Sequence, residues 1–288
     1  METPVFKDQK LQAELDEQGF VKIPFWDTGT VNLVRQKFET EYKSKHISAK
    51  HFHTTYETTN IELINDVRDF LQPLFFKCTD SVFDNMAPVS AGYLIKESNP
   101  DSASPLHQDA SFVDEPKHCS VSVWVALEDI GLKNGCLQFV PGSHRLYTNV
   151  RFIPYTYENI EEYSSILQSY LTQHGIKAGE AFVFYNAVVH ASPPNRTQTD
   201  RITAVMGFYN RGARFSLYVK NEATQRIDRY AITNEQLVQI NATFKPLPEQ
   251  FIESVSLPVP LTEADVKAFV KGNYSFLQRL TVFLKGIF

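Results

Sequence analysis

The sequence predicts a mainly β protein with added helices: a double-stranded β-helix (a cupin-like jelly roll) with an N-terminal helical jacket and C-terminal helices. In the first third of the chain, apolar residues recur three and four positions apart, as on amphipathic helices. From about residue 89 they alternate in short runs separated by Gly, Pro and Asn. The 22 Phe and 13 Tyr suit a sheet-rich chain with a roomy interior.

The N-terminal part, about residues 1–85, is expected to be mainly helical. Its first helix, residues 8–19, ends at Gly19, and glycine is a usual helix stop. After it, the pattern predicts a short strand and then two further helices, over residues 21–25, 30–45 and 60–76.

The jelly-roll core is expected over about residues 86–222. Five β-type runs predict its strands, at residues 91–97, 118–129, 136–143, 180–190 and 201–210. One helix, residues 159–175, interrupts them as a lid or side element, with His174 at its end. Asn134-Gly135 and Pro141-Gly142 are turn signals within this region.

A C-terminal extension is expected over about residues 223–288. It holds two short helices, at residues 234–244 and 262–271, and the capping box "TEAD" begins the second. No internal repeat or low-complexity linker divides the chain. We therefore expect a single domain over residues 1–288.

Composition narrows the function classes. With a formal net charge of −5, the sequence shows no excess of basic residues of the kind that binds nucleic acid. Three cysteines without CxxC spacing argue against a disulfide framework and for a reducing compartment. The N-terminus lacks an apolar signal region, and no apolar run reaches the roughly 18 residues that span a bilayer. We expect a cytoplasmic protein, and no feature decides its oligomeric state.

The stretch "PLHQDAS" carries the first two candidate metal ligands. On an extended chain, residues two apart share a face, so His107 and Asp109 can bind one ion while Gln108 points away. Imidazole and carboxylate together suit a divalent first-row metal. His190, at the end of the run 180–190, supplies the third ligand. Two histidines and one carboxylate form a facial triad that leaves three metal positions open.

Two polar residues follow the last histidine. Ser192 lies two positions after His190, and Arg201 starts the next strand after a turn-rich loop, where it can lie beside the strand of His190. A buried Arg with a hydroxyl group beside a metal can clamp a remote carboxylate through two parallel hydrogen bonds. A dicarboxylate cosubstrate that chelates iron would require such a clamp.

These motifs together resemble a known family. "HQD", "WVALEDIGLKNGCLQFVPGSH" and "HASPPNRTQTDR", within roughly residues 89–212, are similar to the phytanoyl-CoA dioxygenase family of Fe(II)/2-oxoglutarate oxygenases. The resemblance implies Fe(II), 2-oxoglutarate and O2 as cofactor and cosubstrates. By resemblance, the catalytic iron ligands would be His107, Asp109 and His190, and the residues that contact 2-oxoglutarate would be Arg201, Ser192 and Lys96.

The resemblance also implies a reaction. It would be hydroxylation of an unactivated C–H bond of a small molecule, with decarboxylation of 2-oxoglutarate to succinate. Related halogenases replace the carboxylate ligand with a small residue, so the presence of Asp109 favours hydroxylation. Substrates of acyl, amino-acid and natural-product type all stay open. The alternatives are a non-catalytic or sensing metal-binding jelly roll, another oxidation by a member of the same family, and a cupin-type metalloenzyme, which would not need Arg201.

Two further segments have open interpretations. His51 and His53 form another alternating pair, which either contacts substrate at the mouth of the barrel or lies in a solvated loop. The apolar tail, residues 274–288, is a core-packing helix, a dimer surface or an interfacial membrane contact, and it is too short to span a bilayer.

Overall fold

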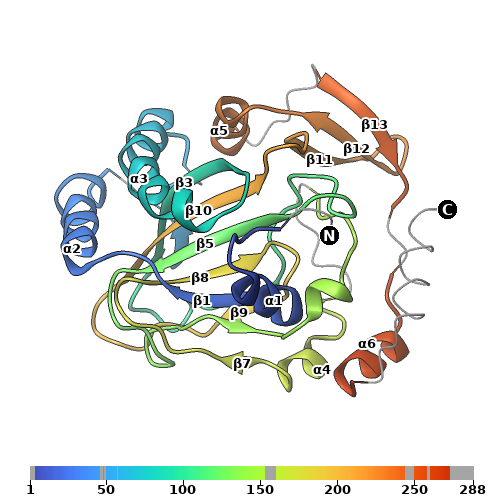
Figure 1. Cartoon of the computed structure of the whole chain (residues 1–288), viewed down its shortest axis with the longest axis horizontal. Helices are drawn as coiled ribbons and strands as arrows, with labels where there is room; N and C mark the ends of the chain where they lie inside the picture. Colours follow the sequence, from blue (N-terminus) through green and yellow to red (C-terminus); the bar gives the residue numbers. More distant parts are fainter. Residues whose placement is uncertain are drawn as a thin grey trace.

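Two antiparallel sheets facing each other form the centre of the computed structural model (Figure 1). The structure describes residues 4–45, 48, 50–56, 58–152, 160–243, 250–257 and 260–272. The larger sheet has the strand order β1-β8-β5-β10-β3-β2, and the smaller has the order β4-β9-β6-β7. This arrangement confirms the predicted jelly-roll core.

The strands of both sheets are short, apart from two long ones in the larger sheet. The larger sheet comprises β1 (Phe20–Pro24), β2 (Phe52–Thr54), β3 (Met86–Lys96), β5 (Ser120–Ala126), β8 (Glu180–Tyr185) and β10 (Arg201–Asn210). The smaller sheet comprises β4 (Ser104–His107), β6 (Gln138–Phe139), β7 (Thr172–Gln173) and β9 (His190–Ser192). The expected N-terminal jacket thus contributes β1 and β2 to the core sheet.

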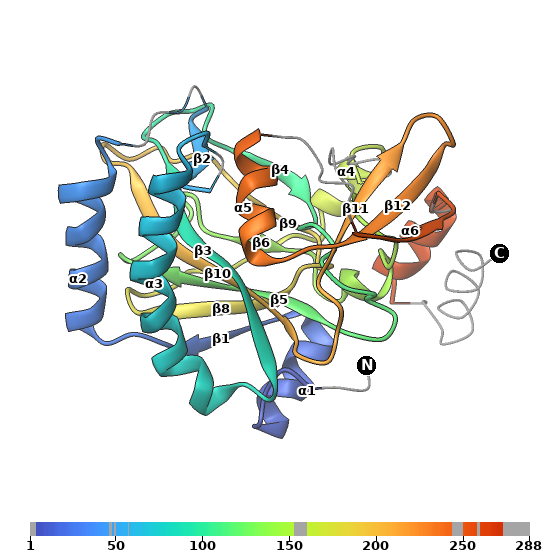
Figure 2. The same cartoon turned by 90° about the horizontal axis from the view of Figure 1, so that it is seen from above.

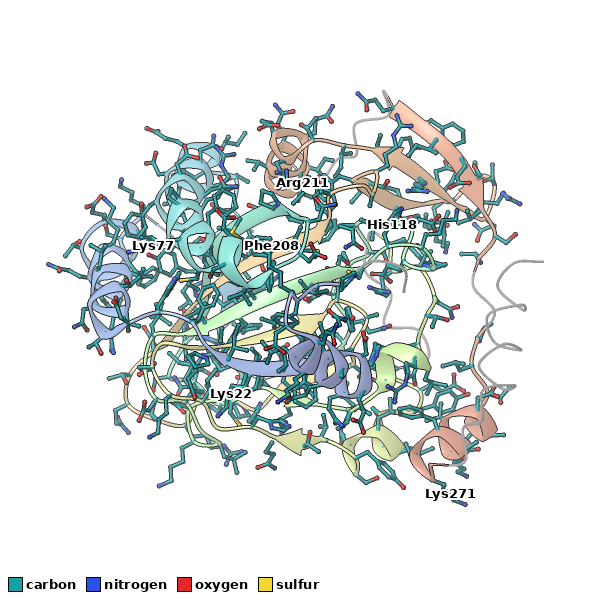
Figure 3. The ribbon with its side chains drawn as sticks, in the orientation of Figure 1. Lys22, Lys77, His118, Phe208, Arg211 and Lys271 are labelled. Atoms are coloured by element: carbon teal, nitrogen blue, oxygen red, sulfur yellow. The ribbon has the colours of Figure 1, made fainter. Side chains whose placement is uncertain are left out.

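Helices cover the outer face of the larger sheet. They are α1 (Gln9–Gln18), α2 (Thr28–Lys37) continued by a π-helix (Phe38–Tyr42), and α3 (Ile61–Val82). Figure 2 shows α2 and α3 side by side over this face. Phe208 of β10 lies beside α3, and its ring meets that of Phe83 edge-on at 5.2 Å (Figure 3). The predicted helices are confirmed, with Asp8 as N-cap of α1 and Gly19 at a φ of 87° as its stop.

Aromatic side chains fill the space between the two sheets. On β5, Trp124 points into this interior, while Val123 and Val125 pack under the helices. Alternation along the strand therefore separates a helix-facing layer from an inner layer. The inner layer includes Phe20, Trp124, Phe139, Phe182 and Phe184, all nearly fully buried.

The core is followed by a third sheet that the sequence patterns did not predict. It has three antiparallel strands, β11 (Ser216–Asn221), β12 (Arg226–Ala231) and β13 (Phe251–Val255). The two predicted C-terminal helices are present as α5 (Asn234–Thr243) and α6 (Glu263–Val270), and the Thr262–Asp265 capping box is formed. The tail, residues 274–288, lies outside the described residues. Within the described part of the chain, no helix is long and apolar enough to cross a bilayer.

The run 180–190 is two strands rather than the one that was predicted. The chain turns after Tyr185, whose carbonyl accepts a hydrogen bond from the Val188 amide at 2.9 Å. His190 therefore begins β9 in the smaller sheet instead of closing a strand of the larger one. Asn186 fixes this turn because its main-chain N–H donates to the carbonyl of Ser120 at 3.1 Å. Spacing along the sequence cannot show this contact.

Two other segments also differ from their predictions. The expected helix over residues 159–175 is described from residue 160 on, and in that part only α4 (Ser164–Gln168) is helical. The chain then forms β7, so that His174 follows a strand and does not end a helix. Pairing of β7 with β6 overrides the helical pattern. The strand expected at 136–143 is only the two-residue β6, because Gly142 adopts a φ of 75° and a 3₁₀-helix (Ser143–Arg145) follows.

The packing of α3 on the larger sheet gives the first prediction. Leu71 of α3 is fully buried in that layer, whereas Leu33 of α2 is 49% exposed. Leu71→Ala should lower the free energy of unfolding by about 2–5 kcal/mol because it leaves a cavity. Leu33→Ala should change it by less than about 0.5 kcal/mol. Urea denaturation measures both, and equal losses would contradict this packing.

Candidate functional site

The three residues of the predicted triad come together between β4 and β9. His107 and His190 are directly opposite each other in this strand pair, with ring centroids 4.1 Å apart. Asp109 lies two residues beyond β4, and its Oδ1 is 4.0 Å from Nε2 of His107 and 3.8 Å from Nε2 of His190. Among the described residues, this is the one group of three or more His, Cys, Asp or Glu with the spacing of a metal site.

Main-chain carbonyls determine which ring nitrogen of each imidazole carries the proton. Nδ1 of His107 is 2.8 Å from the carbonyl of Pro105, and Nδ1 of His190 is 3.0 Å from that of Val188. Nδ1 is therefore the protonated nitrogen, and the lone pair of each Nε2 faces the Asp109 carboxylate. Lone pairs and a carboxylate oxygen repel one another unless a cation lies between them. This donor set therefore fits a divalent metal ion.

Burial keeps this site ready for a metal. It lowers the pKa of His107 to about 4, and the neighbouring His190 lowers it further. The imidazole of His107 is therefore neutral at pH 7, as a metal ligand must be.

Gln108 points away from the triad, as predicted. Its amide Nε2 donates to the carbonyls of Tyr147 at 2.9 Å and Ala187 at 2.5 Å. These bonds hold the residue between the two candidate ligands on the other face of the chain.

Four residues that sequence reasoning missed hold Asp109. The main chain of Asp109 donates to the carbonyl of Asn186 at 2.9 Å and accepts from Nε of Arg151 at 2.8 Å. Glu115 binds the guanidinium of Arg151 with both carboxylate oxygens. The Ser122 hydroxyl donates to Oδ2 of Asp109 at 2.9 Å. The one sequence signal was the alternation in "SVSVWVA", which puts Ser122 on the same inner face as Trp124.

A second buried group lies on the larger sheet, where Arg201 and Lys96 are opposite each other on β10 and β3. Their exposed fractions are 1% and 0%. Nη1 of Arg201 donates to the carbonyl of Gly135 at 2.7 Å, and its guanidinium lies over the ring of Trp124. Nζ of Lys96 donates to the carbonyl of Ser102.

Among the described residues, neither of these two basic side chains has a carboxylate within ion-pair distance, and Nε of Arg201 is buried without a hydrogen bond. Burial lowers the pKa of Arg201 to about 10, and burial with Arg201 nearby lowers that of Lys96 to about 6. A buried pair of this kind is costly without an anion. It therefore fits a bound carboxylate.

Gly135 allows this arrangement. It adopts a φ of 78°, and a Cβ there would lie 2.6 Å from Cδ of Lys96 and 2.7 Å from the carbonyl of Pro193. The predicted Asn134-Gly135 turn thus lets the backbone approach Lys96 closely while its carbonyl binds Arg201.

The strand of Arg201 is not beside that of His190. Arg201 does start a strand, as predicted, but β10 pairs with β3 and β5 in the larger sheet, while β9 belongs to the smaller one. The loop between them crosses from one sheet to the other. Ser192 is buried on β9, two residues after His190 and so on the same strand face.

His51 and His53 lie apart from the triad. Nδ1 of His51 and Nε2 of His53 approach the two oxygens of Glu97 at 2.7 Å and 3.4 Å. Both histidines thus share one carboxylate, next to the β2–β3 pair.

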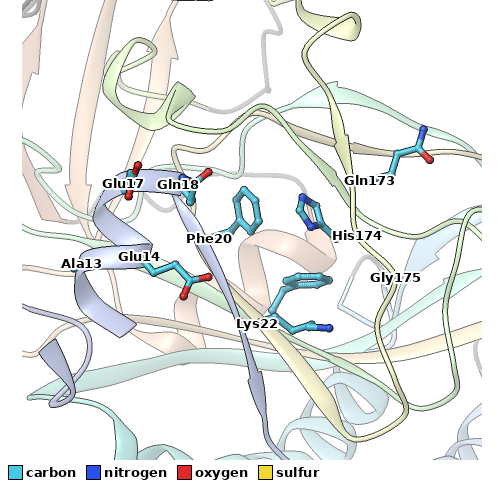
Figure 4. Close-up of a pocket in the computed structure, with 10 residues that line it drawn as sticks. Ala13, Glu14, Glu17, Gln18, Phe20, Lys22, Gln173, His174 and Gly175 are labelled. Atoms are coloured by element: carbon cyan, nitrogen blue, oxygen red, sulfur yellow. The ribbon is translucent and has the colours of Figure 1, made fainter. Parts of the chain in front are cut away.

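A cavity of about 670 Å³ opens elsewhere, between α1, β1, β8 and the segment around β7 (Figure 4). Its lining includes Phe20, Phe182 and His174, and none of the triad. Phe20 stacks on Phe139 at 4.2 Å, and Phe139 lies 6.1 Å from the ring of His190. Aromatic rings thus continue from this cavity to the triad through the interior.

Comparison of solved structures supports the fold. EvdO2 from Micromonospora carbonacea var. aurantiaca, crystallised with 2-oxoglutarate, superimposes with a TM-score of 0.50 at 17% identity over 73% of this chain and 94% of EvdO2. SnoK, described as a non-heme α-ketoglutarate-dependent carbocyclase, gives 0.50 at 18% identity over 72% and 86%.

Sequence comparison identifies the family. A Dictyostelium discoideum homologue of phytanoyl-CoA dioxygenase domain-containing protein 1 is 29% identical over 40% of this chain and 44% of its own length. The phytanoyl-CoA dioxygenase of Arabidopsis thaliana is 30% identical over 46% and 49%. The chain thus spans about half or less of the length of these curated relatives. The family model for phytanoyl-CoA dioxygenase (PhyH) matches residues 10–203, and this chain belongs to that family.

Proposed function

We propose that this chain is an Fe(II)- and 2-oxoglutarate-dependent dioxygenase that hydroxylates an unactivated C–H bond of a small molecule. The carrying observation is that one chain holds both a His–Asp–His group that fits a divalent metal and a buried pair of basic side chains, Arg201 and Lys96, that fits a carboxylate. Family membership and a fold shared with a protein crystallised with 2-oxoglutarate support it. We also propose that residues 1–288 act as one oxygenase domain, since β1 pairs within the core sheet.

The residues have separate tasks in this proposal. His107, Asp109 and His190 would hold the iron, and Arg201, with Ser192 and Lys96, would hold the far carboxylate of 2-oxoglutarate. When bound, the iron would supply the chemistry that converts 2-oxoglutarate, O2 and a substrate C–H bond into succinate, CO2 and an alcohol. The protein orients the ligands, and the rings of Phe139 and Phe184 shield the His190 side of the site from water.

Asp109 favours hydroxylation among the oxidations that the family catalyses, since it occupies the position that halogenases leave for halide. The substrate would be a small molecule of acyl, amino-acid or natural-product type. A non-catalytic metal-binding jelly roll is the competing function. The buried Arg201 and Lys96 weigh against it, because a protein that binds metal alone gains nothing from burying two basic side chains that have no carboxylate within ion-pair distance among the described residues.

The metal assignment can be tested without substrate. Anaerobic protein with Fe(II) and 2-oxoglutarate should develop a weak visible charge-transfer band. His107→Ala should abolish the band and weaken Fe(II) binding by more than about 100-fold, because it removes a direct ligand. His51→Ala, which alters a histidine away from the triad, should keep both. A wild-type protein that binds metal but gives no band would leave only the metal-binding jelly roll.

The role of Arg201 is tested by titrating 2-oxoglutarate into the Fe(II)-loaded protein. Arg201→Ala should raise the Kd of 2-oxoglutarate by about 10- to 100-fold, the usual loss for hydrogen bonds to a charged group, with Fe(II) affinity unchanged. Arg196→Ala removes an exposed arginine from the preceding loop and should have no effect. Equal Kd values for the two variants would exclude the clamp.

The position of Lys96 predicts a pH dependence. With its pKa lowered to about 6, the Lys96 amine is neutral at pH 7–9. A carboxylate bound beside it raises that pKa, so binding takes up a proton. The affinity for 2-oxoglutarate should therefore fall as pH rises above 6, by up to about tenfold per unit.

Calorimetry in two buffers of different ionisation enthalpy measures the proton uptake directly. Lys96→Met should bind without this uptake and with a flatter pH profile. Identical proton uptake in Lys96→Met and wild type would show that another group titrates.

A further inference from the structure

The main chain of Asp109 is fixed on both sides. Its N–H donates to Asn186, and its carbonyl accepts from Arg151, which Glu115 holds with two charged hydrogen bonds. The side chains of Arg151 and Glu115 are 9% and 15% exposed, so this ion pair is largely desolvated. What stays free is the rotation of the Asp109 side chain, and this rotation decides which carboxylate oxygen faces the histidines.

Among the described residues, Ser122 is the one that donates a hydrogen bond to the Asp109 carboxylate, and this bond fixes the rotation. Its hydroxyl is 2.9 Å from Oδ2 of Asp109, while Oδ1 is the oxygen close to both Nε2 atoms. The same hydroxyl is 3.1 Å from Oδ1 of Asn186. It carries a single hydrogen, and the bond to the charged carboxylate is the stronger of the two, so the hydroxyl donates to Asp109.

The apolar surroundings of Ser122 make a buried hydroxyl destabilising unless it forms a hydrogen bond. Ser122 is 8% exposed and lies on the inner face of β5, two residues before Trp124 and opposite Phe184 of β8. An apolar side chain would suit this layer better, and a buried hydroxyl needs its hydrogen bond. Ser122 also bridges the two halves of the core, because it comes from the larger sheet while Asp109 follows a strand of the smaller one.

We propose that Ser122 is a positioning residue for the metal site. Its hydroxyl donates a hydrogen bond to Oδ2 of Asp109. The carboxylate therefore binds the metal through Oδ1 alone and leaves three metal positions open. The inference rests on the proposed function. In this inference Ser122 contacts neither metal, cosubstrate nor substrate, and the residue acts only through Asp109.

The test uses Co(II), whose visible absorption reports the number of ligands as well as the affinity. Ser122→Ala should weaken Co(II) binding by roughly 10- to 100-fold, the usual loss when a partner of a metal ligand is removed, and should change the intensity of the spectrum. Ser122→Thr keeps the donor and should restore both.

Ser90→Ala is the matched control. It removes a hydroxyl from β3 of the same sheet, which is buried and has no hydrogen-bond partner within the described part of the chain, so Co(II) affinity and spectrum should match wild type. If Ser122→Ala only lowers the melting temperature and keeps both readouts, Ser122 is merely structural and the proposal is overturned. If wild type itself binds no Co(II), the metal site and the proposed function fail first, and this inference fails with them.

Discussion

The pairing of His107 with His190 across β4 and β9 is the constraint on which the rest of the site depends. It brings the centroids of the two imidazoles to 4.1 Å, with the ring planes tilted by 46°, before any metal binds. Backbone carbonyls next to each ring set the protonated nitrogen. Asp109 then needs only to reach the space beside them. A site fixed by strand register is more precise than one fixed by loops, because main-chain hydrogen bonds hold both strands.

Charge explains why the two buried groups belong together. The triad contributes one carboxylate and two imidazoles, and the larger sheet contributes Arg201 and Lys96, which have no carboxylate within ion-pair distance among the described residues. A divalent cation chelated by a dicarboxylate would satisfy both groups at once. Each half of the site is thus electrostatically incomplete alone, and the proposed cosubstrate is the ligand that completes both.

The apolar interior between the sheets strengthens the electrostatic interactions of these groups. Aromatic side chains on β5, β6 and β8 exclude water, so that charges interact more strongly than they would at the surface. The same dryness lowers the pKa of Lys96 and of His107. Helix α3 covers the opposite face of the sheet, which gives the buried charges a rigid support.

The sequence by itself determined the jelly-roll class and the N-terminal and C-terminal helices, because capping residues and strand alternation depend on neighbouring positions. It also predicted the candidate triad and Arg201 from residue types and their order along the chain. It could not separate β8 from β9 or find β7. Alternation is identical in every strand and does not say which sheet a strand joins. The partners of Asp109 were equally hidden, because Ser122, Arg151 and Asn186 come from 13 to 77 residues away. Only tertiary packing of the two sheets brings those residues to one carboxylate.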